Sequence, residues 1–213
     1  MPHVVVFLGP SLDQGEARQI LKARYLPPAR RGDLSAAAAE GATVIGLIDG
    51  VFFQDSAVGH REILGALRSG IRVIGASSMG ALRAAEMADF GMEGVGEVFR
   101  MYRDGELVSD DEVALVFDPF TLTPLSEPMV NIRYALRCAR DAGTLSREEA
   151  EAIFSCATRL YYPDRTYPRI CREAAEELGE GPVLRFSAFL KERSPDLKRE
   201  DAIAALRYIS QTL

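Results

Sequence analysis

The stretch from Ile71 to Glu86 decides the fold, and it reads Ile-Arg-Val-Ile-Gly-Ala-Ser-Ser-Met-Gly-Ala-Leu-Arg-Ala-Ala-Glu. Residues 71–74 favour a strand, because three of the four are β-branched. A turn rich in glycine and serine follows at residues 75–80, and the sequence continues as a helix that carries Leu82 and Ala85. Strand, glycine turn and helix in this order form the repeating βα unit of a doubly wound parallel sheet.

Two further strands are predicted upstream of this unit. Residues 4–8 form a continuous apolar run, as expected of a parallel strand that is covered on both faces, and residues 43–48 form a second one. Residues 1–124 are therefore expected to form an α/β core with a small doubly wound, Rossmann-like sheet. From residue 125 to residue 213 only helical spacing recurs, including a capping-box pattern that begins at Ser146, so we expect an all-helical C-terminal region packed on the core.

Composition limits the classes of function. The chain has 213 residues, of which 47% are hydrophobic and 26% are charged, and its net charge is −6. This acidic balance argues against binding to nucleic acid or to an anionic membrane. Three scattered cysteines suggest neither a disulfide framework nor a zinc site, and a reducing, cytoplasmic compartment fits best. The apolar run at residues 4–8 is too short to span a membrane.

Three loops follow the carboxyl ends of the predicted strands, where open α/β sheets bind their ligands. They lie at residues 9–11, 49–53 and 75–80 and are rich in glycine and small polar residues. We expect them to converge on one substrate site. The residues expected to bind substrate there or on the helix that follows are Gly9, Ser11, Gly50, Phe52, Gly75, Gly80 and Arg83.

Ser78 is the first candidate nucleophile. Small residues at Ala76 and Gly80 flank it, which resembles a nucleophile elbow at a strand-to-helix turn. Amides of the helix N-terminus are then available to stabilise an oxyanion. Ser77 competes for the same role, and helix capping or anion binding by either serine explains the pattern equally well.

His60 and Asp49 are the candidates for handling the proton. His60 lies at the start of the helix after the second of these three predicted strands, and an imidazole that reaches a serine is the usual activator of that weak nucleophile. Asp49 ends the same strand, where a carboxylate suits a site better than a core, although Asp-Gly is also a common turn. A capping role for His60 is the alternative. Arg83 and Glu86 stand three residues apart on one helix, as in an ordinary surface pair.

The acidic run at residues 110–112 has the oxygen ligands that Mg²⁺ prefers, but such a run is more often a solvated loop. No metal and no cofactor are therefore expected. A nucleotide-binding enzyme of Rossmann type is a weaker possibility, because neither G-x-G-x-x-G nor a P-loop lysine follows a strand.

Several motifs together resemble the TfuA-like family over roughly residues 3–135. They include Asp49-Gly-Val-Phe, the run from Ala57 to Leu64, the turn and helix from Gly75 to Glu86, and residues 90–96 and 110–113. The resemblance implies an accessory protein of YcaO-type enzymes, which activate a peptide amide oxygen with ATP. It further implies sulfur supply for a backbone thioamide, by hydrolysis of the thiocarboxylate on a small ThiS-type carrier protein.

Such a hydrolysis is acyl transfer, and it needs a nucleophile, an oxyanion stabiliser and a proton donor. Ser78 attacks in one version, with His60 or an aspartate moving the proton. In the other version an activated water attacks, and Ser77 and Ser78 polarise the carbonyl. The alternative function is a binding module without catalysis, which docks on the YcaO-type enzyme and stimulates it or recruits the sulfur donor.

Overall fold

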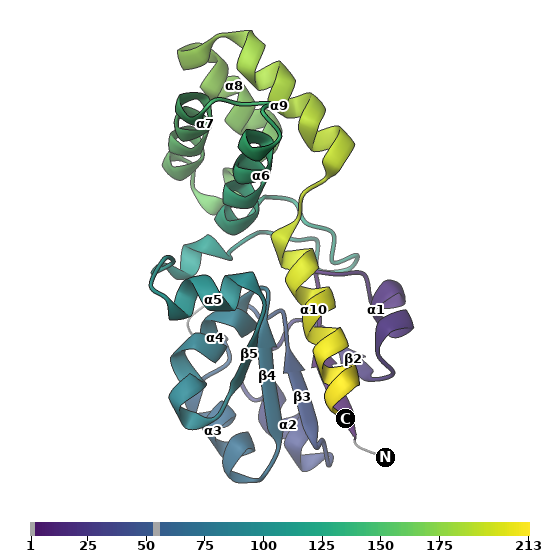
Figure 1. The fold of residues 1–213 in the computed structure, drawn as a ribbon. Helices are drawn as coiled ribbons and strands as arrows, with labels where there is room; N and C mark the ends of the chain where they lie inside the picture. Colours follow the sequence, from purple (N-terminus) through teal and green to yellow (C-terminus); the bar gives the residue numbers. More distant parts are fainter. Residues whose placement is uncertain (1–2, 53–55) are drawn as a thin grey trace. The chain divides into compact units, whose positions relative to one another are not determined.

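The computed structural model describes residues 3–52 and 56–213. The chain forms two compact units (Figure 1). The first comprises residues 1–110 together with residues 198–213, and the second comprises residues 111–197. The expected division at residues 124 and 125 stays a prediction.

The first unit holds a five-stranded sheet in which every pair of neighbouring strands is parallel (Figure 1). Its order is β2-β1-β3-β4-β5. The prediction of a doubly wound α/β fold is thereby confirmed. The strands are β1 (Val4–Phe7), β2 (Arg24–Leu26), β3 (Val44–Leu47), β4 (Arg72–Ala76) and β5 (Glu93–Val95).

Successive side chains of β1 point to opposite faces of the sheet and all of them are buried, so both faces must be covered, and helices cover them. Val4 and Val6 belong to one buried cluster with side chains of α1 and α10, and Val5 and Phe7 belong to the other with side chains of α2, α3 and α4. Helix α5 was not predicted, and α10 was predicted as a helix but not as part of this unit. The helices described in this unit are α1 (Gln14–Ile20), α2 (Asp33–Ala39), α3 (His60–Arg68), α4 (Met79–Met87), α5 (Glu97–Arg103) and α10 (Leu197–Thr212).

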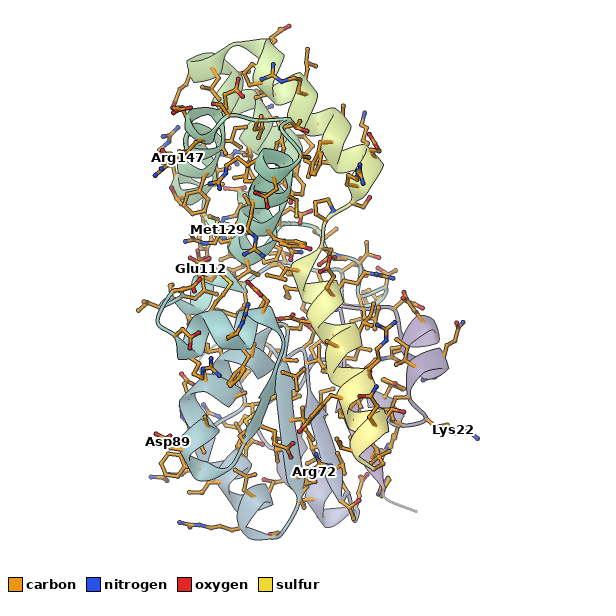
Figure 2. All side chains as sticks on the ribbon, in the orientation of Figure 1. Lys22, Arg72, Asp89, Glu112, Met129 and Arg147 are labelled. Carbon is orange, nitrogen blue, oxygen red and sulfur yellow. The ribbon has the colours of Figure 1, made fainter. Side chains whose placement is uncertain are left out.

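Helix α10 is fixed to the sheet along its length. Ile209 lies so close to β3 that a β-carbon at Gly46 would stand 3.1 Å from the Ile209 methyl group. Near its end, Arg72 of β4, which is labelled in Figure 2, donates to the Thr212 carbonyl at 3.1 Å and also forms a bidentate pair with Glu93 of β5. The last helix of the sequence is therefore a structural part of the first unit.

The second unit is helical, as predicted for this part of the chain. Four helices enclose one apolar core, and the expected capping box is present, with the Ser146 hydroxyl accepting from the Glu149 amide. Met129 begins the first of these helices and Arg147 the second (Figure 2). The helices are α6 (Met129–Asp141), α7 (Arg147–Arg159), α8 (Tyr167–Leu178) and α9 (Glu180–Arg193), and short 3₁₀ turns lie at Ala88–Phe90, Asp110–Glu112 and Tyr162–Asp164.

Candidate functional site

The carboxyl ends of β1 and β3 define the switch point of the sheet, because the chain runs outward from these two neighbouring strands in opposite directions. The Asp49 carboxylate joins the two loops there. Its Oδ2 accepts from the amides of Gly9 at 2.8 Å and Ser11 at 3.1 Å, and its Oδ1 accepts from the Ser11 hydroxyl at 2.6 Å. Asp49 is buried, so these three bonds hold the loops together against little competition from water.

Ser77 extends this arrangement to the end of β4. Its hydroxyl lies 3.0 Å from the Ser11 hydroxyl and 2.8 Å from the Lys198 carbonyl at the start of α10. Ser77 is completely buried. We call Ser11, Asp49 and Ser77 the switch-point cluster, and within it the polar atoms find their partners inside the protein.

The turn after β4 is a strained one. Ser77 has a φ of 68°, in the left-handed region that non-glycine residues rarely adopt. The strained backbone of the turn is therefore at Ser77 and not at Ser78, the candidate nucleophile. Ser78 is the N-cap of α4 and is 5% exposed. Among the described residues, its hydroxyl has no hydrogen-bond partner. The Ser78 hydroxyl is therefore free to bond a ligand without breaking a hydrogen bond between described residues.

The glycines of this turn allow α4 to approach the sheet. A β-carbon at Gly80 would lie 1.7 Å from the Leu47 carbonyl oxygen, and one at Gly75 would lie 2.1 Å from the Gly80 carbonyl oxygen. Similarly, a β-carbon at Gly9 would lie 2.4 Å from Pro28, and one at Gly50 would lie 3.0 Å from Met79. Close packing thus accounts for these four glycines, and their expected role in substrate binding stays a prediction.

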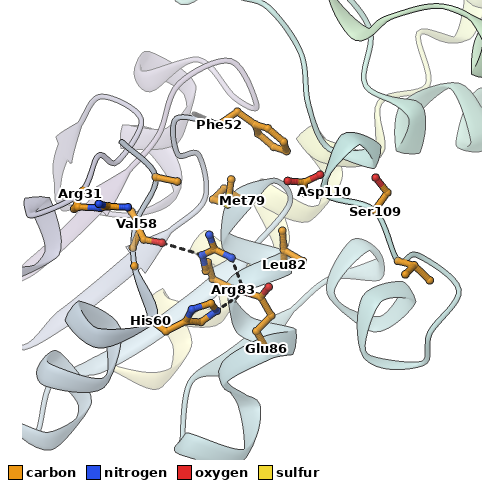
Figure 3. A pocket seen from close by; sticks show the side chains of 13 residues that line it. Arg31, Phe52, Val58, His60, Met79, Leu82, Arg83, Glu86, Ser109 and Asp110 are labelled. Carbon is orange, nitrogen blue, oxygen red and sulfur yellow. Dashed lines mark hydrogen bonds and ion pairs between the residues drawn. The ribbon is translucent and has the colours of Figure 1, made fainter. Parts of the chain in front are cut away.

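An open pocket of about 480 Å³ lies beside the same edge of the sheet, between the N-terminus of α3 and one face of α4 (Figure 3). His60 and Glu86 face each other in it, with the His60 Nε2 atom 2.8 Å from the Glu86 Oε2 atom. Arg83 donates to the same oxygen at 2.6 Å and to the Val58 carbonyl at 2.9 Å. We call this the imidazole pocket; its lining residues are Arg31, Phe52, Ala57, Val58, Gly59, His60, Met79, Leu82, Arg83, Glu86, Val108, Ser109 and Asp110.

The structure thus brings the predicted residues together in two groups. Asp49 and Ser77 meet through Ser11, whereas His60 lies in the imidazole pocket with Phe52 and Arg83. No hydrogen bond between described residues links His60 to either serine or to Asp49. Part of the loop expected at residues 49–53 also lies outside the described residues, because residue 53 does.

Two residues that the sequence analysis did not place in the site belong to these groups. Glu86 is the partner of His60, although 26 residues separate them, and Lys198 places its carbonyl against Ser77 while its own side chain is 2% exposed. Only the spacing of Arg83 and Glu86 gave a signal, and that signal concerned an ordinary pair within one helix. No pattern indicated that the last helix returns to this edge of the sheet.

Two residues of the acidic run at residues 110–112 form ion pairs. Asp111 pairs with Arg165 at 2.7 Å, and Glu112 pairs with Arg133 at 2.7 Å. Within residues 3–52 and 56–213, no group of three or more histidine, cysteine or acidic residues is arranged to hold a metal ion.

These features define a doubly wound α/β protein with a polar switch point and an adjoining open pocket. A family model of TfuA-like proteins matches residues 49–166, more than half of the chain, and this range includes Asp49, His60, both serines and Glu86. The chain belongs to the TfuA-like family. A search of curated proteins gives no match.

Membership of this family supports an accessory role in the biosynthesis of thioamides. In the part of the chain that the structure describes, no helix has the length and apolar character that crossing a membrane requires.

Proposed function

We propose that this protein supplies sulfide to a YcaO-type enzyme by hydrolysing the C-terminal thiocarboxylate of a ThiS-type carrier protein. In this reaction an oxygen nucleophile adds to the thiocarboxylate carbon and the carbon–sulfur bond breaks. Water supplies the oxygen in the end, so a thiocarboxylate and one water give a carboxylate and hydrogen sulfide. No oxidant or reductant is needed.

The observation that supports this proposal is the imidazole pocket. It is open to solvent and lies at the edge of the sheet where this class of fold binds ligands. A proton acceptor, His60, stands there with a cationic side chain, Arg83, on the neighbouring helix. An imidazole and a nearby cation are what attack on an anionic acyl group requires.

Two nucleophiles fit the proposal. Among the described residues the Ser78 hydroxyl has no hydrogen-bond partner, so it is available to form an acyl-serine that water then hydrolyses. Alternatively, water attacks directly in the pocket. In either case sulfide leaves as the anion and takes up a proton that the nucleophile has lost.

The test is sulfide release from a purified carrier that has been converted to its thiocarboxylate, with no YcaO-type enzyme present. We expect stoichiometric sulfide and free carrier carboxylate, measured by a sulfide-reactive dye and by intact mass. Carrier alone gives the spontaneous rate. If the protein does not exceed that rate, the hydrolase proposal fails. Retained activity in both Ser77→Ala and Ser78→Ala eliminates the serine version.

A binding module is the second candidate, and the switch-point cluster favours it. Asp49, Ser11 and Ser77 use their hydrogen bonds on one another and on the backbone, as residues with a structural role do. The discriminating experiment supplies free sulfide to the YcaO-type enzyme and its peptide. Full thioamidation that still requires this protein supports the module, whereas thioamidation without it supports sulfur delivery.

A further inference from the structure

We propose that the imidazole pocket holds the C-terminal tail of the carrier protein, extended along α4, with its thiocarboxylate at the turn after β4. Phe52 then covers the part of the tail near the turn, and Glu86 binds the tail at the far end of the pocket. This inference rests on the proposed function, with a serine of that turn as the nucleophile. It adds the residues that recognise the tail and the tail sequence that they select.

One face of α4 forms a wall of the pocket. The residues of α4 that line it are three or four positions apart, which places them on a single stripe of the helix: Met79, Leu82, Arg83 and Glu86. The stripe begins directly after Ser78, the N-cap of α4. At a rise of about 1.5 Å per residue it is about 10 Å long. It therefore leads from the serine turn outward along the helix.

The length of this stripe matches a short stretch of extended peptide. An extended chain advances about 3.3 Å per residue, so about three residues cover the distance from the turn to Glu86. A tail with its terminal thiocarboxylate at Ser78 consequently places its third residue from the end beside Glu86.

The part of the pocket near the turn is apolar. Figure 3 shows Phe52 and Met79 toward the end at which α4 begins, and Leu82 follows one helical turn later. A charged side chain among these groups would lose its hydration without gaining a partner. The pocket thus selects uncharged residues at the last two positions of the tail.

The far end of the pocket presents a carboxylate oxygen that can accept a hydrogen bond. The Glu86 Oε2 atom lies 2.8 Å from the His60 Nε2 atom and accepts from Arg83 at 2.6 Å. Among the described residues, the other oxygen of Glu86, Oε1, has no hydrogen-bond partner. The Glu86 side chain is 36% exposed, so Oε1 can accept the main-chain N–H of the third residue of the tail.

Glu86 is held in place before a tail arrives. Arg83, which bonds its carboxylate, also donates from Nε to the Val58 carbonyl at 2.9 Å, and the Arg83 side chain is only 15% exposed. An acceptor that is already fixed loses little conformational entropy on binding. This arrangement distinguishes Glu86 from a mobile surface carboxylate.

The first experiment measures how tightly the carrier binds. The carrier is used in its carboxylate form, labelled with a fluorophore at its N-terminus, and its Kd is measured by fluorescence anisotropy. Glu86→Ala and Phe52→Ala should each weaken binding about tenfold. In the assay of sulfide release, both variants should raise KM by a similar factor with kcat within about twofold, because they bind the tail equally before and during the reaction.

The second experiment varies the tail of the carrier. Proline at the third residue from the end removes the N–H donor, so it should weaken binding to the wild-type protein about tenfold and should have no further effect in Glu86→Ala. Aspartate at the second residue from the end should weaken binding at least about tenfold. Aspartate at the sixth residue from the end is the matched control, because that residue lies beyond the stripe, and it should change the Kd less than about twofold.

Glu40→Gln is the control variant of the protein. It breaks an exposed ion pair with Arg24, and neither residue lines the pocket, so it should bind the carrier as the wild type does. Because partly exposed ion pairs contribute only about 0–1 kcal/mol, Glu86→Ala should fold normally. Far-ultraviolet circular dichroism and the midpoint of urea unfolding verify this for both pocket variants.

The outcomes separate the two proposals. A Kd within about twofold of the wild type in both pocket variants overturns the tail site and leaves the hydrolase intact. A full effect of the proline tail in Glu86→Ala overturns the hydrogen bond to Glu86. If the pocket variants lose affinity for the peptide substrate of the YcaO-type enzyme and not for the carrier, the assignment of the pocket to the carrier is wrong. A carrier that binds through the pocket without releasing sulfide overturns the hydrolase and supports the tail site.

Discussion

Replacing Gly80 by alanine should push α4 away from the sheet. A β-carbon at this position would lie 1.7 Å from the Leu47 carbonyl oxygen and 2.6 Å from its carbon. Because unstrained contacts between carbon and oxygen are about 3.3 Å or longer, the helix must move by about 1.5 Å. Both neighbours are backbone atoms of a central strand, so they cannot turn aside as a flexible side chain can.

The free energy follows from this movement. Inserting a methyl group into a packed interior costs about 1–3 kcal/mol, and the hydrogen bond from the Gly80 amide to the Ile48 carbonyl, 3.2 Å long, contributes about 1 kcal/mol more. We therefore expect Gly80→Ala to lower the free energy of unfolding by about 3 kcal/mol. Because Arg83 and Glu86 line the imidazole pocket and lie on the displaced helix, the proposed sulfide release should fall as well.

Urea unfolding measures this change through its midpoint. The matched control is Gly65→Ala in α3, where a β-carbon meets no atom within 4 Å. This control should raise the free energy of unfolding by about 0.5–1 kcal/mol, because alanine favours a helix. If Gly80→Ala unfolds within about 1 kcal/mol of the wild type, the close approach of α4 to β3 is wrong.

Three further predictions concern buried polar groups. Burial raises the pKa of Asp201 to about 6, although the hydrogen bonds that its carboxylate accepts from the amides of Glu97 and Val98 lower that pKa. The folded state therefore keeps the Asp201 carboxyl protonated to a higher pH than the unfolded chain does. The protonated carboxyl contributes its full stabilisation below about pH 4, and this is lost as the pH rises through 6, which lowers the free energy of unfolding by about 3 kcal/mol. Urea titrations of Asp201→Asn should lack this decline. An unchanged decline in that variant contradicts the raised pKa of Asp201. Asp49→Asn should lower the free energy of unfolding, measured by urea titration, by about 2–3 kcal/mol, because the asparagine side chain has one oxygen and cannot accept all three hydrogen bonds of the carboxylate. A decrease below about 0.5 kcal/mol would refute the role of Asp49 in joining the two loops. Tyr167→Phe should leave the midpoint of thermal unfolding unchanged or raise it, since the buried hydroxyl has no partner among the described residues, and a marked fall would reveal one.

The sequence predicted those strands whose apolar pattern extends over enough residues to be recognised. The strands β1, β3 and β4 are β-branched and apolar, and they were expected within two residues of where they lie. The edge strands β2 and β5 have three residues each and contain Arg24, Glu93 and Gly94, so they carry no apolar pattern. Their pairing depends on the neighbouring strand and not on their own composition.

The candidate site was predicted where it depends on local topology. Parallel strands place their carboxyl ends at one edge, so the loops after β1, β3 and β4 were expected to meet, and Ser11, Asp49 and Ser77 do so. The partner of His60 depends instead on how α3 packs beside α4. No spacing in the sequence encodes that packing, and the imidazole was consequently assigned to the serine and not to Glu86.

The separation of the two groups bears on where a macromolecular substrate can react. In the proposed hydrolysis a carrier tail must reach the reacting atom, and sulfide must leave it, which an atom accessible in the resting protein allows directly. Ser77 meets neither condition, because it is buried and its hydroxyl is bonded between Ser11 and the start of α10. The His60 imidazole meets both, being half exposed in an open pocket. The switch-point cluster thus fixes the loops of the sheet edge, and the imidazole pocket beside it is open to an incoming substrate.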